Sequence, residues 1–103
     1  MNINDFNYHG ITLGAISFLI IGIFHPLVIK GEYYLGKKMV WIFLVMGIIA
    51  STTSICVENI FFSTSLGIFG FASFWGIKEV FEQIERVREG RFPKNPNRKY
   101  TND

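Results

Sequence analysis

Three long apolar stretches, separated by short polar segments, dominate the pattern of hydrophobic and polar positions along the chain. They cover residues 11–29, 39–57 and 60–77. Each stretch has about 18 or 19 residues, close to the roughly 20 that a helix needs to cross a hydrocarbon core of about 30 Å. The pattern therefore predicts three membrane-spanning helices.

The links between these stretches are short: residues 30–38 form the first, and only Glu58 and Asn59 form the second. Because backbone polar groups are not left unsatisfied in lipid, such short links predict antiparallel neighbouring helices. The predicted fold class is all-α, an integral membrane three-helix bundle with up-down-up topology. Residues 1–90 are expected to form its single transmembrane domain.

Beyond residue 77 we expect the third helix to continue into the cytoplasm over residues 78–89. Apolar residues recur there at helical spacing, and Lys78, Glu82 and Arg86 follow one another at intervals of four, so that they can pair along the solvated side. Gly90 is a natural end for this helix. The segment 91–103 contains two prolines and many polar residues, which predict a mobile basic tail.

The basic residues are distributed unequally between the two ends of the predicted bundle. All ten lie in the first link or after the third stretch: Lys30, Lys37, Lys38, Lys78, Arg86, Arg88, Arg91, Lys94, Arg98 and Lys99. Short loops rich in Lys and Arg stay on the cytoplasmic side of a membrane. We therefore expect a multi-pass protein of the cytoplasmic (inner) membrane, with its N-terminus outside and its C-terminus in the cytoplasm.

The composition agrees with a membrane protein, so the basic residues are interpreted as flanking charges of membrane spans. Half of the 103 residues are hydrophobic, 17% are aromatic, and the mean hydropathy is +0.31, which is too apolar for an ordinary soluble domain. The net charge of +2 is small, and the cations flank the predicted spans. We therefore expect the lipid bilayer to be a partner, and we do not expect the protein to bind nucleic acid. The single cysteine, Cys56, excludes a disulfide within the chain.

Small residues share one face of each predicted helix. They are Gly10, Gly14, Gly47, Ser51, Ser63, Gly67 and Gly70. In lipid, helices associate through close backbone contact, which small side chains permit. Two interpretations stay open: these residues pack the three helices against one another, or they join copies in a homo-oligomer or bind another membrane protein.

His25 and Pro26 stand side by side near the end of the first stretch. Pro26 has no N–H to donate to the carbonyl of Gly22, so a helix kink is expected at this pair. His25 is interpreted either as a polar group that hydrogen-bonds a neighbouring helix near the headgroups, or as a switch that gates, relays protons or binds a ligand or metal.

Two acids complete the candidate functional polar residues. Glu32, with Tyr33, Tyr34 and the three lysines of the first link, predicts an aromatic and basic rim that anchors the protein at the interface or binds anionic lipid. Glu58 lies in the second link, close to Cys56 and separated from His25 by most of the bilayer.

That separation prevents Glu58, Cys56 and His25 from converging on one metal ion, which needs three or four ligands. The sequence also contains no phosphate loop, no dinucleotide fingerprint and no set of nucleophile, base and orienting residue. We therefore expect no metal, no cofactor, no catalytic residue and no enzymatic activity.

The segments FHPLVIKGEYYLG and FWGIKEVFEQIERVREGRFPKNPNRK resemble a family of small bacterial membrane proteins known as a domain of unknown function, numbered four-four-nine-one. The resemblance runs over nearly the whole chain and rests on the pair His25–Pro26, residues 32–34, Glu82, Arg86 and residues 92–96. It implies a bacterial membrane protein and no catalytic residue.

Two functions follow from these patterns. The first is a non-enzymatic oligomeric membrane protein of transport or channel-like type, in which His25 or Glu58 faces a path between copies. Against this function, no span carries an acid or base at the membrane centre, which is the usual mark of an ion pathway. The alternative is a structural or regulatory accessory subunit that presents its cytoplasmic helix, residues 78–89, and its basic tail to another membrane protein.

Overall fold

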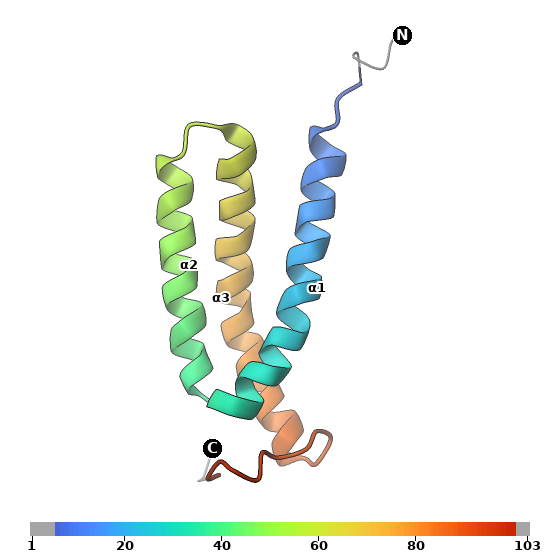
Figure 1. Cartoon of the computed structure of the whole chain (residues 1–103), viewed down its shortest axis with the longest axis vertical. Coiled ribbons are helices and arrows are strands. Elements are labelled where there is room, and N and C mark those ends of the chain that lie inside the picture. Colours follow the sequence, from blue (N-terminus) through green and yellow to red (C-terminus); the bar gives the residue numbers. More distant parts are fainter. Residues whose placement is uncertain (1–5, 101–103) are drawn as a thin grey trace.

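The computed structural model describes residues 6–100 and contains three α-helices, with no strand in that range. The helices are α1 (His9–Leu35), α2 (Lys38–Cys56) and α3 (Ile60–Arg88), and they alternate in direction along the bundle (Figure 1). The predicted all-α three-helix fold is confirmed. Residues 1–5 of the predicted domain and residues 101–103 of the predicted tail lie outside the described residues.

All three helices are long and apolar enough to cross a membrane, which indicates a small membrane protein. α1 runs past residue 29 to Leu35, and α3 runs past residue 77 to Arg88, as the expected extension of the third helix requires. We call the end that holds residues 36–37, the last turns of α3 and the tail the basic end. The end that holds residues 57–59 is the turn end.

Local sequence explains where the helices begin and end. The Asn59 side chain accepts a 3.1 Å hydrogen bond from the backbone N–H of Phe62 and so caps α3, while extended Val57 ends α2. Gly36 follows α1 with a φ of +62° and Gly90 follows α3 with a φ of +87°, a region that glycine enters without steric cost.

α2 and α3 pack closely through small residues. A side chain at Gly70 would meet Ser51, one at Gly47 would meet the ring of Phe74, and one at Gly67 would touch Ser54. Toward the turn end, Ser54 Oγ donates a 2.6 Å hydrogen bond to the Ser63 carbonyl, and Ser63 Oγ donates a 2.7 Å bond to the Ser54 carbonyl. Five of the predicted packing residues therefore lie at this contact: Gly47, Ser51, Ser63, Gly67 and Gly70.

α1 behaves differently, because it packs on α3 near the basic end and leans away from it toward the turn end (Figure 1). Gly10 and Gly14 consequently have open space around them, with no atom of residues 6–100 within 4 Å of where a Cβ would stand. These two residues therefore do not pack against α2 or α3, contrary to the interpretation that every small-residue stripe joins helices of one chain.

The apolar core lies at the basic end, where all three helices meet. It consists of Phe24, Val28, Met39, Phe43, Val80 and Ile84. Phe43 is fully buried, and its ring lies over Gly76, where a Cβ would stand 3.2 Å from the ring. This core holds the part of α1 near the basic end against the α2–α3 pair. The part of α1 near the turn end lies outside the core.

Candidate functional site

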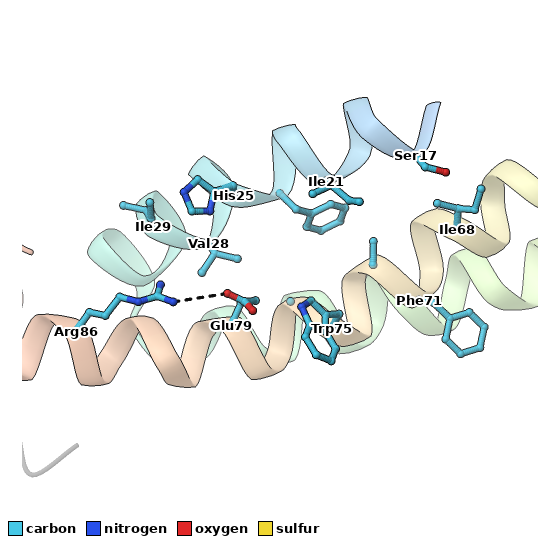
Figure 2. Close-up of a pocket in the computed structure, with 13 residues that line it drawn as sticks. Ser17, Ile21, His25, Val28, Ile29, Ile68, Phe71, Trp75, Glu79 and Arg86 are labelled. Carbon is cyan, nitrogen blue, oxygen red and sulfur yellow. Dashed lines mark ion pairs between the residues drawn. The ribbon is translucent and has the colours of Figure 1, made fainter. Parts of the chain in front are cut away.

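A groove of about 630 Å³ opens between α1 and α3, on the side where the two helices diverge. Ser17, Ile21 and Phe24 line it from α1, and Ile68 and Trp75 are among the residues that line it from α3. Figure 2 shows its two ends, with Ser17 and Ile68 at one and His25, Glu79 and Arg86 at the other. The groove is therefore apolar along its length and polar at its basic end, which we call the mouth.

The mouth places a loose ion pair opposite a histidine. Arg86 Nη2 lies 3.9 Å from Glu79 Oε2 and 3.6 Å from Glu82 Oε2, and Arg86 Nη1 donates a 2.9 Å hydrogen bond to Gln83 Oε1. The side chains of Glu79 and Arg86 lie on the side of α3 that faces α1 (Figure 2). Both are about a quarter exposed, so they can still accept another partner.

His25 projects from α1 into this mouth and is exposed. Within residues 6–100 it makes no hydrogen bond and no ion pair, so the interpretation as a group bonded to a neighbouring helix finds no partner there. Gly22 and Pro26 are exposed as well, and α1 bends toward α2 over its last turns (Figure 1). Pro26 lies inside α1 and cannot bond the Gly22 carbonyl, which is the physical reason for expecting a bend in this part of the helix.

Glu32 lies in a second polar cluster, beneath the tail. Arg98 Nη2 donates a 2.8 Å hydrogen bond to Glu32 Oε2, and the Glu32 side chain is only 3% exposed. Glu32 therefore does not stand on the exposed rim predicted with Lys30, Lys37 and Lys38, which are themselves exposed.

The tail after α3 has no helix over residues 91–100, yet it is held against α1. Asn95 is buried, and its Nδ2 donates a 3.1 Å hydrogen bond to the carbonyl of Tyr33. Its backbone N–H donates to the Tyr100 hydroxyl at 2.7 Å, and the Arg98 guanidinium stacks over the Tyr100 ring at 4.1 Å. These contacts fold residues 91–100 back over the end of α1, and the mobility predicted for this segment stays a prediction.

The environment of Arg98 keeps it charged. Burial lowers the pKa of its guanidinium, but hydrogen bonds to Tyr100 and Glu32 and their charges outweigh burial, and the pKa is raised above its ordinary value. The raised pKa favours the charged form of Arg98, which is the form that pairs with the Glu32 carboxylate.

Glu58 is exposed in the turn between α2 and α3, and Cys56 beside it is an exposed free thiol. In residues 6–100, no three side chains of His, Cys, Asp and Glu come together as a group that could hold a metal ion. Glu58 and His25 lie at opposite ends of the bundle, so the structure does not bring the three candidate polar residues into one site.

Several polar residues at the basic end were not predicted. Gln83 is 1% exposed, and its spacing from Val80 and Val87 places it on the buried stripe of α3, a pattern that could have identified it. Glu79 occupies the edge of the same stripe. Arg98 and Asn95 carry no such signal, because a pattern of helical periodicity does not reveal where a non-helical tail returns to the bundle.

Comparison with known protein families identifies the family of the chain. The model of a domain of unknown function, DUF4491, matches residues 7–98. The chain belongs to this family. Searches of curated proteins and of solved structures each found no match. The resemblance expected from the sequence is thus confirmed, and the match covers both the groove and the Glu32–Arg98 pair of this DUF4491 protein.

Proposed function

We propose that this DUF4491 protein is a non-enzymatic membrane protein of the bacterial cytoplasmic membrane that works as a homo-oligomer. The observation that carries the proposal is the open face of α1 near the turn end. In the part of the chain that the structure describes, nothing lies within 4 Å of a Cβ position at Gly10 or Gly14, while the small residues of α2 and α3 are already in mutual contact. A GxxxG spacing in lipid suits a close helix–helix contact, and here that contact requires another chain.

Transport or channel-like activity, in this proposal, belongs to the assembly and not to one copy. The buried polar side chains of the described chain are Glu32, Ser73, Gln83 and Asn95, and most of them gather at the basic end. They do not form a continuous row through the span in residues 6–100. A path for a polar solute would therefore run between copies, with His25 near its cytoplasmic opening.

The accessory-subunit alternative draws less support from the geometry. It relied on an apolar stripe of the cytoplasmic helix being free for a partner, but Val80, Ile84 and Val87 are buried within the chain. Phe81 is exposed on the same helix and is the residue through which a partner could still bind.

The test is the mass of the full chain in nanodiscs, measured by native mass spectrometry. We expect a defined homo-oligomer, and we expect Gly14→Leu to shift it toward the monomer because the larger side chain prevents close contact. Gly22→Leu is the matched control, since Gly22 lies on the same helix and also has nothing within 4 Å of a Cβ position.

A wild-type protein that stays monomeric over the accessible concentration range would contradict the oligomer and favour the accessory role. If the oligomer forms, solute flux into liposomes that contain the wild type or His25→Ala tests the transport part separately. Equal flux with empty liposomes would contradict a path between copies.

A further inference from the structure

The length of α3 places the mouth of the α1–α3 groove near one boundary of a hydrocarbon core of ordinary thickness. At 1.5 Å per residue, Glu79 lies about 28 Å along α3 from Ile60, which is close to the thickness of a hydrocarbon core. Trp75 lines the groove one turn before Glu79 and is exposed, and Lys78 Nζ stands 4.4 Å from its ring centre. An aromatic ring next to a lysine at this position is typical of a membrane interface.

The groove above the mouth has the size and the lining of a site for an acyl chain. Its volume of about 630 Å³ falls within the range of about 300–1,000 Å³ that is usual for small-molecule sites. Ile21 and Phe71 are two of its lining residues, and both are exposed in the isolated chain. In a bilayer such a surface is in contact with hydrocarbon.

The charges around the mouth are of both signs. Lys78 Nζ pairs with Glu82 at 3.2 Å, and Arg86 lies 3.6 Å from Glu82 and 3.9 Å from Glu79. Two carboxylates and two cations leave the cluster without net charge, which suits a zwitterionic headgroup better than an anionic one. Within the part of the chain that the structure describes, Glu79 has Arg86 as its only ion-pair partner, at the longest of these distances.

We propose that the groove binds an ethanolamine phospholipid from the leaflet at the basic end. One acyl chain lies between α1 and α3, and the headgroup lies between His25, Glu79 and Arg86. The phosphate accepts hydrogen bonds from the Arg86 guanidinium and from an imidazole N–H of His25, which has no other partner in residues 6–100. The ammonium group donates to the Glu79 carboxylate.

The headgroup is specified by its N–H donors. A primary ammonium donates hydrogen bonds to a carboxylate, whereas the trimethylated nitrogen of a choline lipid has no N–H to donate. A glycerol headgroup carries no cation and leaves Glu79 beside a phosphate of the same sign. The site therefore distinguishes ethanolamine from both choline and glycerol lipids through one carboxylate. The headgroup contacts at His25, Glu79 and Arg86 lie toward the opposite end of the bundle from Gly10 and Gly14, so they do not require the proposed oligomer contact.

The test uses the full chain in nanodiscs made from equal amounts of phosphatidylethanolamine, phosphatidylcholine and phosphatidylglycerol with identical acyl chains. Native mass spectrometry after release counts the lipids that stay bound. We expect ethanolamine lipid to be enriched about tenfold over choline lipid, the ratio that one charge-assisted hydrogen bond supports. Glu79→Gln removes this preference, and Glu85→Gln, on the same helix but outside the groove, keeps it.

A second pair of variants distinguishes binding of the acyl chain from recognition of the headgroup. Ile21→Trp fills the groove and lowers the retention of all three lipids, whereas Ile48→Trp, on an exposed position of α2 outside the groove, does not. Equal retention of the three lipids, a preference for the glycerol lipid, or an ethanolamine preference that survives Glu79→Gln would overturn the proposal. A folded wild type that retains no lipid would overturn it as well.

Discussion

Arg98 of the tail donates a 2.8 Å hydrogen bond to Glu32 in the last turn of α1, and so joins two residues that are 66 positions apart in the sequence. Glu32 as a whole residue is 2% exposed, so it has almost no contact with water. A buried carboxylate is costly unless a cation and hydrogen bonds compensate it. The tail therefore covers the basic end and also supplies the counter-charge that allows Glu32 to lie there.

Replacement of Arg98 by glutamine is expected to destabilise the protein strongly. The change leaves Glu32 buried without its cation, which typically lowers the free energy of unfolding by about 3 kcal/mol or more. Denaturant titration in detergent, followed by circular dichroism, measures the loss. Lys99→Gln, an exposed neighbour in the tail, is the control and is expected to change stability by less than about 0.5 kcal/mol. Equal stability of both variants would show that the pair contributes nothing.

Replacing both partners with apolar residues is expected to restore much of that stability. Glu32→Leu combined with Arg98→Met removes the two charges together, and such exchanges are often neutral because no unpaired charge remains. The double variant should therefore be more stable than Arg98→Gln in the same titration. A double variant as unstable as the single one would indicate that the geometry of the tail, and not the buried charge, is what matters.

The contribution of the Glu32–Arg98 ion pair to stability is expected to persist in alkaline solution up to the ordinary pKa of arginine. Because the pKa of folded Arg98 is raised, its stabilising contribution is fully present below the ordinary arginine value and is lost only as pH rises through the still higher folded value. Lysine at this position titrates earlier, so Arg98→Lys should lose additional stability above about pH 10 while the wild type does not. The difference between their melting temperatures as a function of pH measures this, and parallel curves would contradict it.

A methyl group at Gly70 is expected to disrupt the α2–α3 contact. Its Cβ would stand 2.5 Å from Ser51 Oγ and 3.2 Å from the Ser51 backbone nitrogen, so the helices would have to separate. Gly70→Ala should lower the free energy of unfolding by about 1–3 kcal/mol. Gly14→Ala, which meets nothing within 4 Å, should leave the stability of the monomer unchanged or slightly higher because alanine favours the helix. The same denaturant titration compares the two, and equal losses would contradict this packing.

The proposed orientation can be read from thiol labelling in intact cells. In a Cys56→Ser background, Glu58→Cys places a single exposed thiol at the turn end and Lys94→Cys places one at the basic end. A membrane-impermeant maleimide is expected to label the first in intact cells and the second only after permeabilisation, because short loops rich in lysine and arginine stay on the cytoplasmic side of a membrane. The reverse pattern would contradict the positive-inside assignment.

The fold could be predicted from the sequence because its determinants are local. Apolar stretches of membrane-spanning length and two short links specify three antiparallel helices, and the small residues at Gly47, Ser51 and Gly70 mark the faces through which α2 and α3 approach. Lys78, Glu82 and Arg86 also pair at intervals of four as their spacing predicts.

The free face of α1 and the partner of Glu32 could not be predicted, because they depend on how distant parts of the chain are placed in space. The stripe at Gly10 and Gly14 looks like those of the other helices, but the divergence of α1 from α3 leaves it without a contact to residues of α2 or α3. Similarly, Glu32 looks like an exposed acid among three lysines, and its cation turns out to be Arg98 of the tail. Which of ten cations meets one carboxylate is decided by the path of the tail, for which no periodic pattern exists.

Among residues 6–100, α1 contributes its core residues Phe24 and Val28 near the basic end, and it diverges from α3 toward the turn end like a lever about this point. From Phe24 to His9 the lever arm is about 22 Å long, so a rotation of only about 10° displaces its free end by about 4 Å. The α2–α3 pair, in contrast, is joined near its own turn by the two hydrogen bonds between Ser54 and Ser63. The width of the molecule at the basic end is therefore set by contacts of the core, whereas its width at the turn end is set by the angle between α1 and α3.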